Sequence, residues 1–538
     1  MNILEIGRKL RRKSGPTALV VLRPYVREAR GIGRAVRLWL LFGITLTYCL
    51  FSGFFFALTA PYLIMPFTIP VGVLGACAIW ALPDMRRAPT RIMAGLFWAF
   101  LVALIAWPNY LAIALPGLPW ITMIRLTGIP LMLFLLICVS VSAEFRRAMA
   151  NALGAAPLMW KTLVAFIAIQ VLSIGLSKHP ADSLQTFLVS QLGWTSIFFA
   201  SCYLFLKPGR LETWARLLWG LGVFVALIGL FEAHRGQVLW AGHIPSFLQV
   251  DDPMIGNILS GSVRNDEYRA QSTFSTPLGF AEFLTLVLPF ALHFAIQPYG
   301  RLTRIAAVLS IPILIQANFS SGARLGVVGM IMTGALCLGF WSVTRWRRSR
   351  QDLLGAAIIF SYPAIFCAVM ASTLFVGRIR QKVWGNGTQQ ASTDSRKQQY
   401  AMGFDKLLSH PLGTGAGMGA DTLGYFNEAG EGSIDTYYLS IALEYGIIGF
   451  LLYYGFLLQG VYFSTKFALR PEAHGRDDFS FFGPLTNALV NFLVIKSVFS
   501  QESNHPLAFM MIGAVVALVY RIERDGRAAP ASMAAIRL

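Results

Sequence analysis

The chain has 538 residues, of which 56% are hydrophobic and only 13% are charged, and its formal net charge is +19. A mean hydropathy of +0.59 over this length excludes a water-soluble globular protein. We therefore expect an all-α integral membrane protein, because a helix satisfies its backbone hydrogen bonds inside lipid.

Apolar runs long enough to cross a bilayer recur along the whole chain. A hydrocarbon core of roughly 30 Å takes about 20 apolar residues per helical crossing. We predict about fourteen transmembrane helices, within a range of twelve to fourteen. They cover residues 38–60, 61–82, 92–113, 121–142, 157–177, 186–206, 215–232, 277–297, 303–319, 325–343, 353–376, 437–463, 481–499 and 505–520.

These spans divide the chain into four parts. Residues 1–37 form a basic arm, 38–91 two accessory helices, 92–520 the main membrane domain, and 521–538 a short tail. Two loops of the main domain are long, at about 233–276 and 377–436. Long loops held by a rigid scaffold often carry function, so we expect the functional site there.

The positions of Lys and Arg predict the orientation of the chain. Short loops rich in these residues stay in the cytoplasm. With a cytoplasmic N-terminus, 32 of the 45 Lys and Arg residues fall on the cytoplasmic side, and the C-terminus lies there too. The two long loops then face the opposite side. The positive charge is thus explained by topology, and we expect no nucleic-acid partner.

The second long loop contains a segment with helical spacing, Ser395–His410. We predict an amphipathic helix on the membrane face, with Asp394 as its cap. A purely structural lid is an equally open interpretation of this helix. Its apolar positions are Ala401, Phe404, Leu407 and Leu408.

Two arginines are predicted at the same membrane surface as the long loops. Arg269 begins Arg-Ala-Gln-Ser-Thr-Phe-Ser-Thr-Pro, and Arg324 lies in the tight turn Ser-Ser-Gly-Ala-Arg-Leu-Gly. Further along come His-Pro-Leu-Gly-Thr-Gly-Ala-Gly (410–417) and Ser-Ile-Asp-Thr-Tyr-Tyr-Leu-Ser-Ile-Ala-Leu-Glu-Tyr-Gly-Ile-Ile-Gly (433–449). Over about 215–460, this set of motifs resembles the O-antigen ligase and O-antigen polymerase superfamily of membrane glycosyltransferases.

The resemblance implies a GT-C-like fold in the bacterial inner membrane and a metal-independent, cofactor-free, inverting transfer on the periplasmic face. The implied substrate is an undecaprenyl-diphosphate-linked glycan, and a chain-length regulator and a flippase are the implied protein partners. Arg269 and Arg324 match the two arginine positions of the family motifs. A guanidinium binds phosphate bidentately, so two of them can stabilise charge on a departing diphosphate.

Asp435 distinguishes two enzymatic interpretations. In the ligases that the chain resembles, a His thought to act as a base opens this segment, whereas polymerase-like members commonly have Asp. We therefore favour polymerisation of repeat units into O-antigen or exopolysaccharide, with ligation of glycan to lipid A–core as the alternative. Asp435 either accepts a proton or positions a sugar hydroxyl. If it is not the base, Glu428 and Glu431 are the next choices.

The other polar residues near these motifs complete the predicted site. We expect Glu444 to pair with an arginine or a backbone group, because it begins a membrane span. Lys496, Glu502 and Arg125 lie near the outer ends of their spans, where snorkelling to the interface is the default expectation. The predicted substrate-binding residues are Arg264, Arg378, Arg380, His410, Tyr438 and Glu444.

Cysteine and histidine usage gives no metal or disulfide signal. The six cysteines fall inside predicted spans without a CxxC pair. His179 and His410 each precede proline and have no second histidine at ligand spacing, so we expect no metal.

A transporter is the competing function from another class. A lipid-linked oligosaccharide flippase would have a similar number of helices. Transporters, however, tend to show repeated halves and polar groups near the bilayer midplane, whereas here the ionisable residues cluster in outer loops and no repeat is visible. A scaffold role is the third option, and the paired arginines disfavour it.

Overall fold

The structure is a computed structural model that describes most of the chain from Ile64 onward. The predicted arm and the first predicted span, 38–60, lie almost entirely outside the described residues. The chain divides into Met1–Pro83, in which helix α4 (Ile64–Ala81) is described, and Asp84–Leu538. The other gaps are residue 86, 114–119, 249–251, 265–266, 352, 376–387, 427–431, 471–477 and 537–538.

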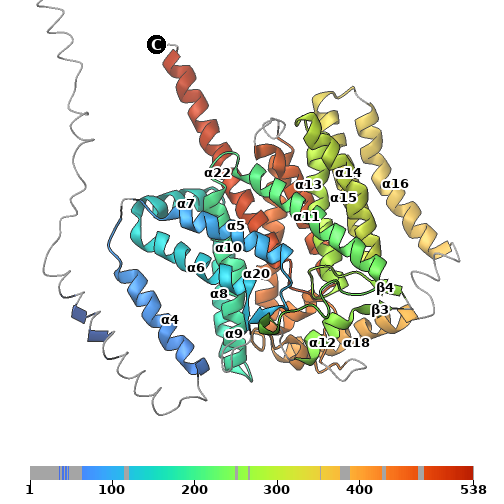
Figure 1. The fold of residues 1–538 in the computed structure, drawn as a ribbon. Helices are drawn as coiled ribbons and strands as arrows, with labels where there is room; N and C mark the ends of the chain where they lie inside the picture. The colour runs from blue at the N-terminus through green and yellow to red at the C-terminus, as the bar shows by residue number, and fades with distance from the viewer. Residues whose placement is uncertain are drawn as a thin grey trace, which may run out of the picture. The chain divides into compact units, whose positions relative to one another are not determined.

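The second unit is a helical bundle (Figure 1). Its first half contains α5 (Thr90–Ala106), α6 (Met123–Val141), α7 (Ala143–Ala155), α8 (Pro157–Ile174), α9 (Pro180–Ser190), α10 (Ser196–Leu204), α11 (Arg210–Arg235) and α12 (Pro253–Ser260). Its second half contains α13 (Pro277–Ile296), α14 (Arg301–Ser320), α15 (Arg324–Arg348), α16 (Leu353–Phe375), α18 (Thr388–Ser409), α19 (Gly419–Leu423), α20 (Tyr437–Ala468), α21 (Phe482–Lys496) and α22 (His505–Ile536).

Sheet structure is minimal in the part of the chain that the structure describes. Strands β1 (Ala112–Ile113) and β2 (Ile121–Thr122) form one antiparallel pair, and β3 (Ser262–Arg264) and β4 (Glu267–Arg269) form another. Ten described helices are long and apolar enough to cross a membrane, and shorter apolar stretches include Thr90–Ala106 and Leu353–Ile365. The all-α membrane fold is therefore confirmed, while the count of fourteen spans stays a prediction.

Two predicted boundaries are wrong. The span predicted at 92–113 ends at Ala106, because Pro108 disfavours helical backbone at Trp107, which is extended at φ −108° and ψ 128°. The span predicted at 186–206 begins earlier, at Pro180, and contains a π-helical turn over Gln191–Thr195. Pro180 occupies the first turn of this helix, where its missing N–H leaves no bond unmade.

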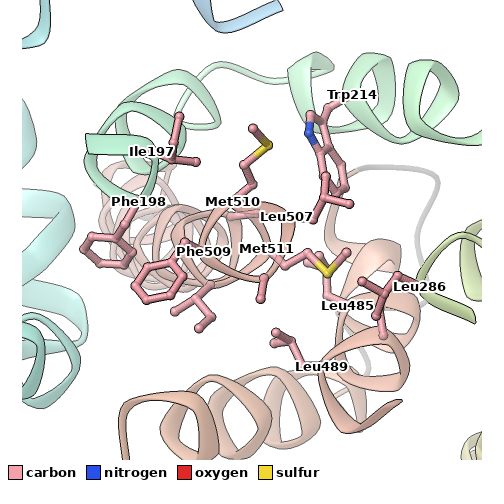
Figure 2. Close-up of a cluster of buried hydrophobic side chains, with 14 of the residues drawn as sticks. Ile197, Phe198, Trp214, Leu286, Leu485, Leu489, Leu507, Phe509, Met510 and Met511 are labelled. Atoms are coloured by element: carbon pink, nitrogen blue, oxygen red, sulfur yellow. The ribbon is translucent and has the colours of Figure 1, made fainter. Parts of the chain in front are cut away.

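Helix α22 forms the centre of the bundle and is the most buried of the ten spans. In Figure 2, Leu507, Phe509, Met510 and Met511 of this helix lie among side chains from α10, α11, α13 and α21. A helix that is apolar all round is expected where every face is covered. Helix α14, by contrast, exposes apolar side chains such as Leu302 and Leu309.

The bundle has two chemically different ends. Helices α11 and α14 finish, and α13, α15, α20 and α22 begin, at the end where α12, α18, β3 and β4 lie (Figure 1). We call this the loop end. The opposite end carries clusters such as Arg345, Arg347 and Arg348 at the end of α15, and we call it the arginine-rich end.

A buried clamp holds the arginine-rich end together. The Asp478 carboxylate accepts a hydrogen bond from the Gly209 amide at 2.8 Å, just before α11. The same carboxylate pairs with Arg521 of α22 at 2.6 Å, and both side chains are almost fully buried. Asp478 precedes α21, so this one carboxylate joins three helices.

The split of basic residues predicts which end faces the outside. A single cysteine placed at the exposed Asn257 of α12 should react with an impermeant thiol reagent in intact spheroplasts, and one placed at Gln351 should not. Labelling before and after permeabilisation, in a background lacking the six native cysteines, measures this. Labelling of Gln351→Cys before permeabilisation would reverse the orientation.

Candidate functional site at the loop end

Arg269 and Arg324 meet at one tight turn of the loop end. The Nε of Arg269, at the end of β4, donates to the Ser321 carbonyl at 2.9 Å. The Ala270 amide donates to the Ser320 carbonyl, also at 2.9 Å. Arg324 follows this turn as the first residue of α15 and is exposed. Arg269 therefore contacts the turn that directly precedes Arg324 in the sequence.

The turn depends on Gly322. Its φ of +62° lies in the left-handed region, and a Cβ there would be 3.0 Å from the Arg269 Nε. A side chain at this position would therefore strain the backbone and push Arg269 away. The glycine lets the Arg269 side chain lie directly on the turn that precedes Arg324.

A buried carboxylate, Glu232, fixes the segment that carries Arg269. It accepts the Tyr268 hydroxyl at 2.7 Å and the amides of Gln271 and Ser272 at 3.1 and 2.7 Å. Ser272 has an unusual positive φ of 54° for a residue other than glycine, which these bonds help to hold. Burial and the neighbouring Glu232 raise the pKa of the Tyr268 phenol, which keeps this hydroxyl a donor. Glu232 is the last residue of the span predicted at 215–232, and the sequence did not indicate this role.

A fully buried ion pair lies beside the turn at residues 320–323, which Arg269 contacts and which Arg324 follows. This turn is called the arginine turn below. Lys496 Nζ of α21 is 2.9 Å from Glu282 Oε1 of α13, and neither side chain is exposed. Asn504 Nδ2 donates to Glu282 Oε2 at 3.0 Å, and Lys496 also donates to the Gln501 carbonyl. The expectation that Lys496 snorkels is wrong, because a carboxylate from another helix lies within reach inside the bundle.

Aromatic rings surround the buried ammonium. Lys496 Nζ lies 5.1 Å from the Phe492 ring centroid and 5.7 Å from that of Tyr437. The His505 ring is 4.4 Å from the Tyr437 ring and stacks on Trp194 at 5.5 Å. Within the described part of the chain, His505 Nε2 and Tyr437 Oη are buried without a hydrogen-bond partner. Glu282, Lys496, Asn504, Tyr437 and His505 are called the charge centre below.

A small apolar cluster connects the arginine turn to the charge centre. Ala323 precedes Arg324 and packs with Ala281, Ile495 and Phe499. Ala281 and Ile495 directly precede Glu282 and Lys496 in the sequence. This apolar cluster therefore lies between the arginine turn and the ion pair of Glu282 and Lys496.

Asp435 lies at the start of α20, one residue before the Thr436 cap. Its amide donates to Gln399 Oε1 of α18 at 2.9 Å. Its carboxylate is 3.9 Å from Arg396 Nε and about one third exposed. Asp435 is therefore accessible from the loop end, and α18 supplies its nearest partners.

Helix α18 includes nearly all of the helix predicted at Ser395–His410, but it begins earlier than predicted. The helix begins at Thr388, so Asp394 does not cap it and instead pairs with Lys397 at 4.0 Å. Gly403 and Leu407 pack against the cluster that contains Leu439 of α20, while Phe404 and Leu408 are exposed. The apolar residues thus divide between the α20 contact and the outer surface.

The remaining predicted substrate-binding residues are dispersed. Arg264 lies in β3 opposite Glu267, and the exposed His410 follows α18. The Tyr438 hydroxyl donates to the Leu493 carbonyl at 3.0 Å and so ties α20 to α21. Arg378 and Arg380, like the alternative bases Glu428 and Glu431, lie outside the described residues.

Glu444 is hydrogen-bonded to the glycine-rich loop at residues 410–417. The Glu444 carboxylate accepts the Ser440 hydroxyl at 2.8 Å and the Gly417 amide, so among the described residues its partner is a backbone group and not an arginine. Gly446 breaks α20 with φ 68° and ψ −175°, and the amides of Thr414 and Gly415 donate to the Glu444 carbonyl at 3.1 and 3.0 Å. These two amides are therefore occupied and are not available to a substrate.

Comparison with known proteins identifies a family for part of this region. Residues 305–454 match the family model described as O-antigen ligase. The matched range includes Arg324, Asp435 and Glu444, and it stops before Lys496. No curated protein matches the chain.

The buried ion pair generates a stability prediction. Glu282→Gln leaves the ammonium of Lys496 without its counter-charge, so the variant should lose about 3–5 kcal/mol of stability. The double variant Glu282→Leu, Lys496→Met removes both charges and should lose clearly less. Thermal unfolding of the purified protein in detergent measures both. Equal losses in the two variants would show that the pairing of these charges does not matter.

Proposed function

We propose that the protein polymerises lipid-linked glycan repeat units, as a member of the O-antigen ligase and polymerase superfamily that the match over residues 305–454 supports. The proposed donor is an undecaprenyl-diphosphate-linked oligosaccharide, and the product is O-antigen or exopolysaccharide. The observation that carries the proposal is the packing of Arg269 on the turn that begins α15 at Arg324.

The arginine turn has the properties of a diphosphate site. The side chain of Arg324 is exposed and makes no hydrogen bond or ion pair within the described part of the chain. It begins a 25-residue helix, and the positive end of the helix dipole favours an anion there. A bidentate guanidinium beside such amides stabilises the negative charge that develops on a departing diphosphate.

The acceptor approaches from the α20 side in this proposal. Asp435 stands at the start of α20, where the ligases that the chain resembles have a histidine. This difference favours repeat-unit polymerisation over ligation. We take the loop end as periplasmic because most Lys and Arg residues fall on the other side.

Reaction chemistry follows from this arrangement. An acceptor hydroxyl attacks the anomeric carbon of the donor from the face opposite the diphosphate, and the bond to the diphosphate oxygen breaks. The diphosphate leaves with the bonding electrons and stays between the arginines. The attack inverts the anomeric configuration, and the hydroxyl proton passes to a carboxylate.

Removal of either arginine should affect turnover and leave the fold intact. We expect Arg269→Ala and Arg324→Ala each to lower the transfer rate by about 10²–10³-fold, because each removes a preorganised charge-stabilising donor. Arg324→Lys should recover only part, since an ammonium lacks the bidentate fork. The matched control is Arg235→Ala, an exposed arginine at the end of α11. Normal transfer by either alanine variant would remove that arginine from the site.

The length of the product decides between polymerase and ligase. Purified protein supplied with a lipid-linked repeat unit should produce a ladder of lipid-linked chains, each longer by one unit. In cells that lack the gene, single repeat units should cap the lipid core. If transfer occurs only onto lipid A–core and lipid-linked polymer accumulates in the deletion strain, the protein is a ligase. Movement of the donor across the bilayer without cleavage would indicate a flippase.

A further inference from the structure

The loop at residues 497–504, between α21 and α22, lies between the two halves of the proposed site. On one side, Val498 and Phe499 belong to the apolar cluster with Ala323, next to Arg324. On the other side, Lys496 and His505 at the ends of this loop contact the ring of Tyr437, two residues after Asp435. The loop therefore spans from the arginine turn to the start of α20.

One carboxylate of this loop, Glu502, is accessible. Its side chain is exposed, in contrast to the fully buried Glu282. The surrounding protein atoms nevertheless raise the pKa of Glu502, and the charge of Lys496 opposes this shift. The Tyr437 side chain also lies near Glu502 and favours its charged form, which opposes the same shift. A small molecule can therefore reach the Glu502 carboxylate, which is less hydrated than a carboxylate on an open surface.

Backbone contacts fix the position of Glu502. Its carbonyl accepts the His505 amide at 3.0 Å and lies 2.9 Å from the His505 Nδ1. The preceding carbonyl, of Gln501, accepts Lys496 Nζ. The following residue, Ser503, packs against Gly279 at the start of α13, with its Oγ 3.2 Å from where a Cβ would be if Gly279 had a side chain. Three helices thus hold this short segment in place.

We propose that Glu502 is the base that accepts the proton of the acceptor's sugar hydroxyl, in a subsite between the arginine turn and the start of α20. This inference rests on the proposed glycosyl transfer. Glu502 takes the proton as the acceptor oxygen bonds to the anomeric carbon, and the diphosphate leaves with the electrons of the broken bond. Glu502 then returns the proton to solvent.

Within the part of the chain that the structure describes, the acceptor-side carboxylates of Asp435 and Glu502 have different surroundings, and we assign them different tasks. The Asp435 carboxylate lies 3.9 Å from Arg396 Nε of α18, within the distance of an ion pair. Glu502 lies beside Lys496, and that ammonium is already committed to Glu282 and to the Gln501 carbonyl. In this proposal Asp435 orients the acceptor sugar by hydrogen bonding, and Glu502 accepts the proton.

Substitution of Glu502 by glutamine tests the role directly. Glu502→Gln keeps the size of the side chain and cannot accept a proton, so transfer should fall by about 10²–10⁴-fold while the KM for donor stays unchanged. The matched control, Asp405→Asn on the exposed face of α18, should transfer at the wild-type rate. Asp435→Asn should raise the KM for acceptor more than it lowers kcat. Normal transfer by Glu502→Gln would overturn the inference.

Azide rescue separates a base from a structural residue. Azide is a nucleophile that needs no deprotonation, so it should attack the anomeric carbon in Glu502→Ala and release the lipid diphosphate together with a glycosyl azide. The same addition should not rescue Arg324→Ala, in which the leaving group lacks its partner. A Glu502→Ala protein that stays folded, binds donor and gains no cleavage with azide would show that Glu502 is not the base.

The wild-type protein separates this inference from the proposed function. If wild-type protein cleaves no lipid-diphosphate donor with any acceptor, the proposed transfer itself is wrong. If it transfers normally and Glu502→Gln does too, only the role of Glu502 is wrong.

Discussion

The buried ion pair between Glu282 and Lys496 is the constraint around which the loop end is organised. Two charges without solvent inside an apolar bundle are tolerated only when each has its counter-charge and hydrogen bonds. Glu282 belongs to α13 and Lys496 to α21, so their contact at 2.9 Å fixes how these helices meet. Asn504 at the start of α22 adds a third helix. The arginine turn and the start of α20 pack around this fixed point.

Hydrogen bonds also hold in place segments that the sequence predicts to be loops. Glu232 holds the residues around Arg269 by three hydrogen bonds, and Gly322 allows Arg269 to lie on the turn before α15. The glycine-rich loop is likewise bonded to the break in α20 at Gly446. A site that stabilises developing charge benefits from donors already in place, because they need no reorganisation during the reaction.

Sequence alone predicts the membrane fold and assigns Arg269 and Arg324 to the same membrane surface. Hydropathy marks the spans, and alternation of basic loops assigns both arginines to one surface. It does not predict the boundary at Trp107, where Pro108 overrides an apolar run.

The same reasoning misses the charge centre, because Glu282 and Lys496 are 214 residues apart and their pairing depends on how α13 packs against α21. Glu232 is missed for a similar reason, since its partners come from a later loop. The role of Glu502 likewise depends on neighbours from other helices. The spacing around Phe404 correctly indicates a helix, but it does not show which apolar side chains contact α20.

A structure with a non-hydrolysable polyprenyl-diphosphate-linked sugar bound tests the central claim most directly. The account predicts diphosphate oxygens within hydrogen-bond distance of the guanidinium groups of Arg269 and Arg324. It also predicts that the anomeric carbon faces the space between Glu502 and Asp435. A diphosphate bound at the arginine-rich end, with the arginine turn empty, would contradict it.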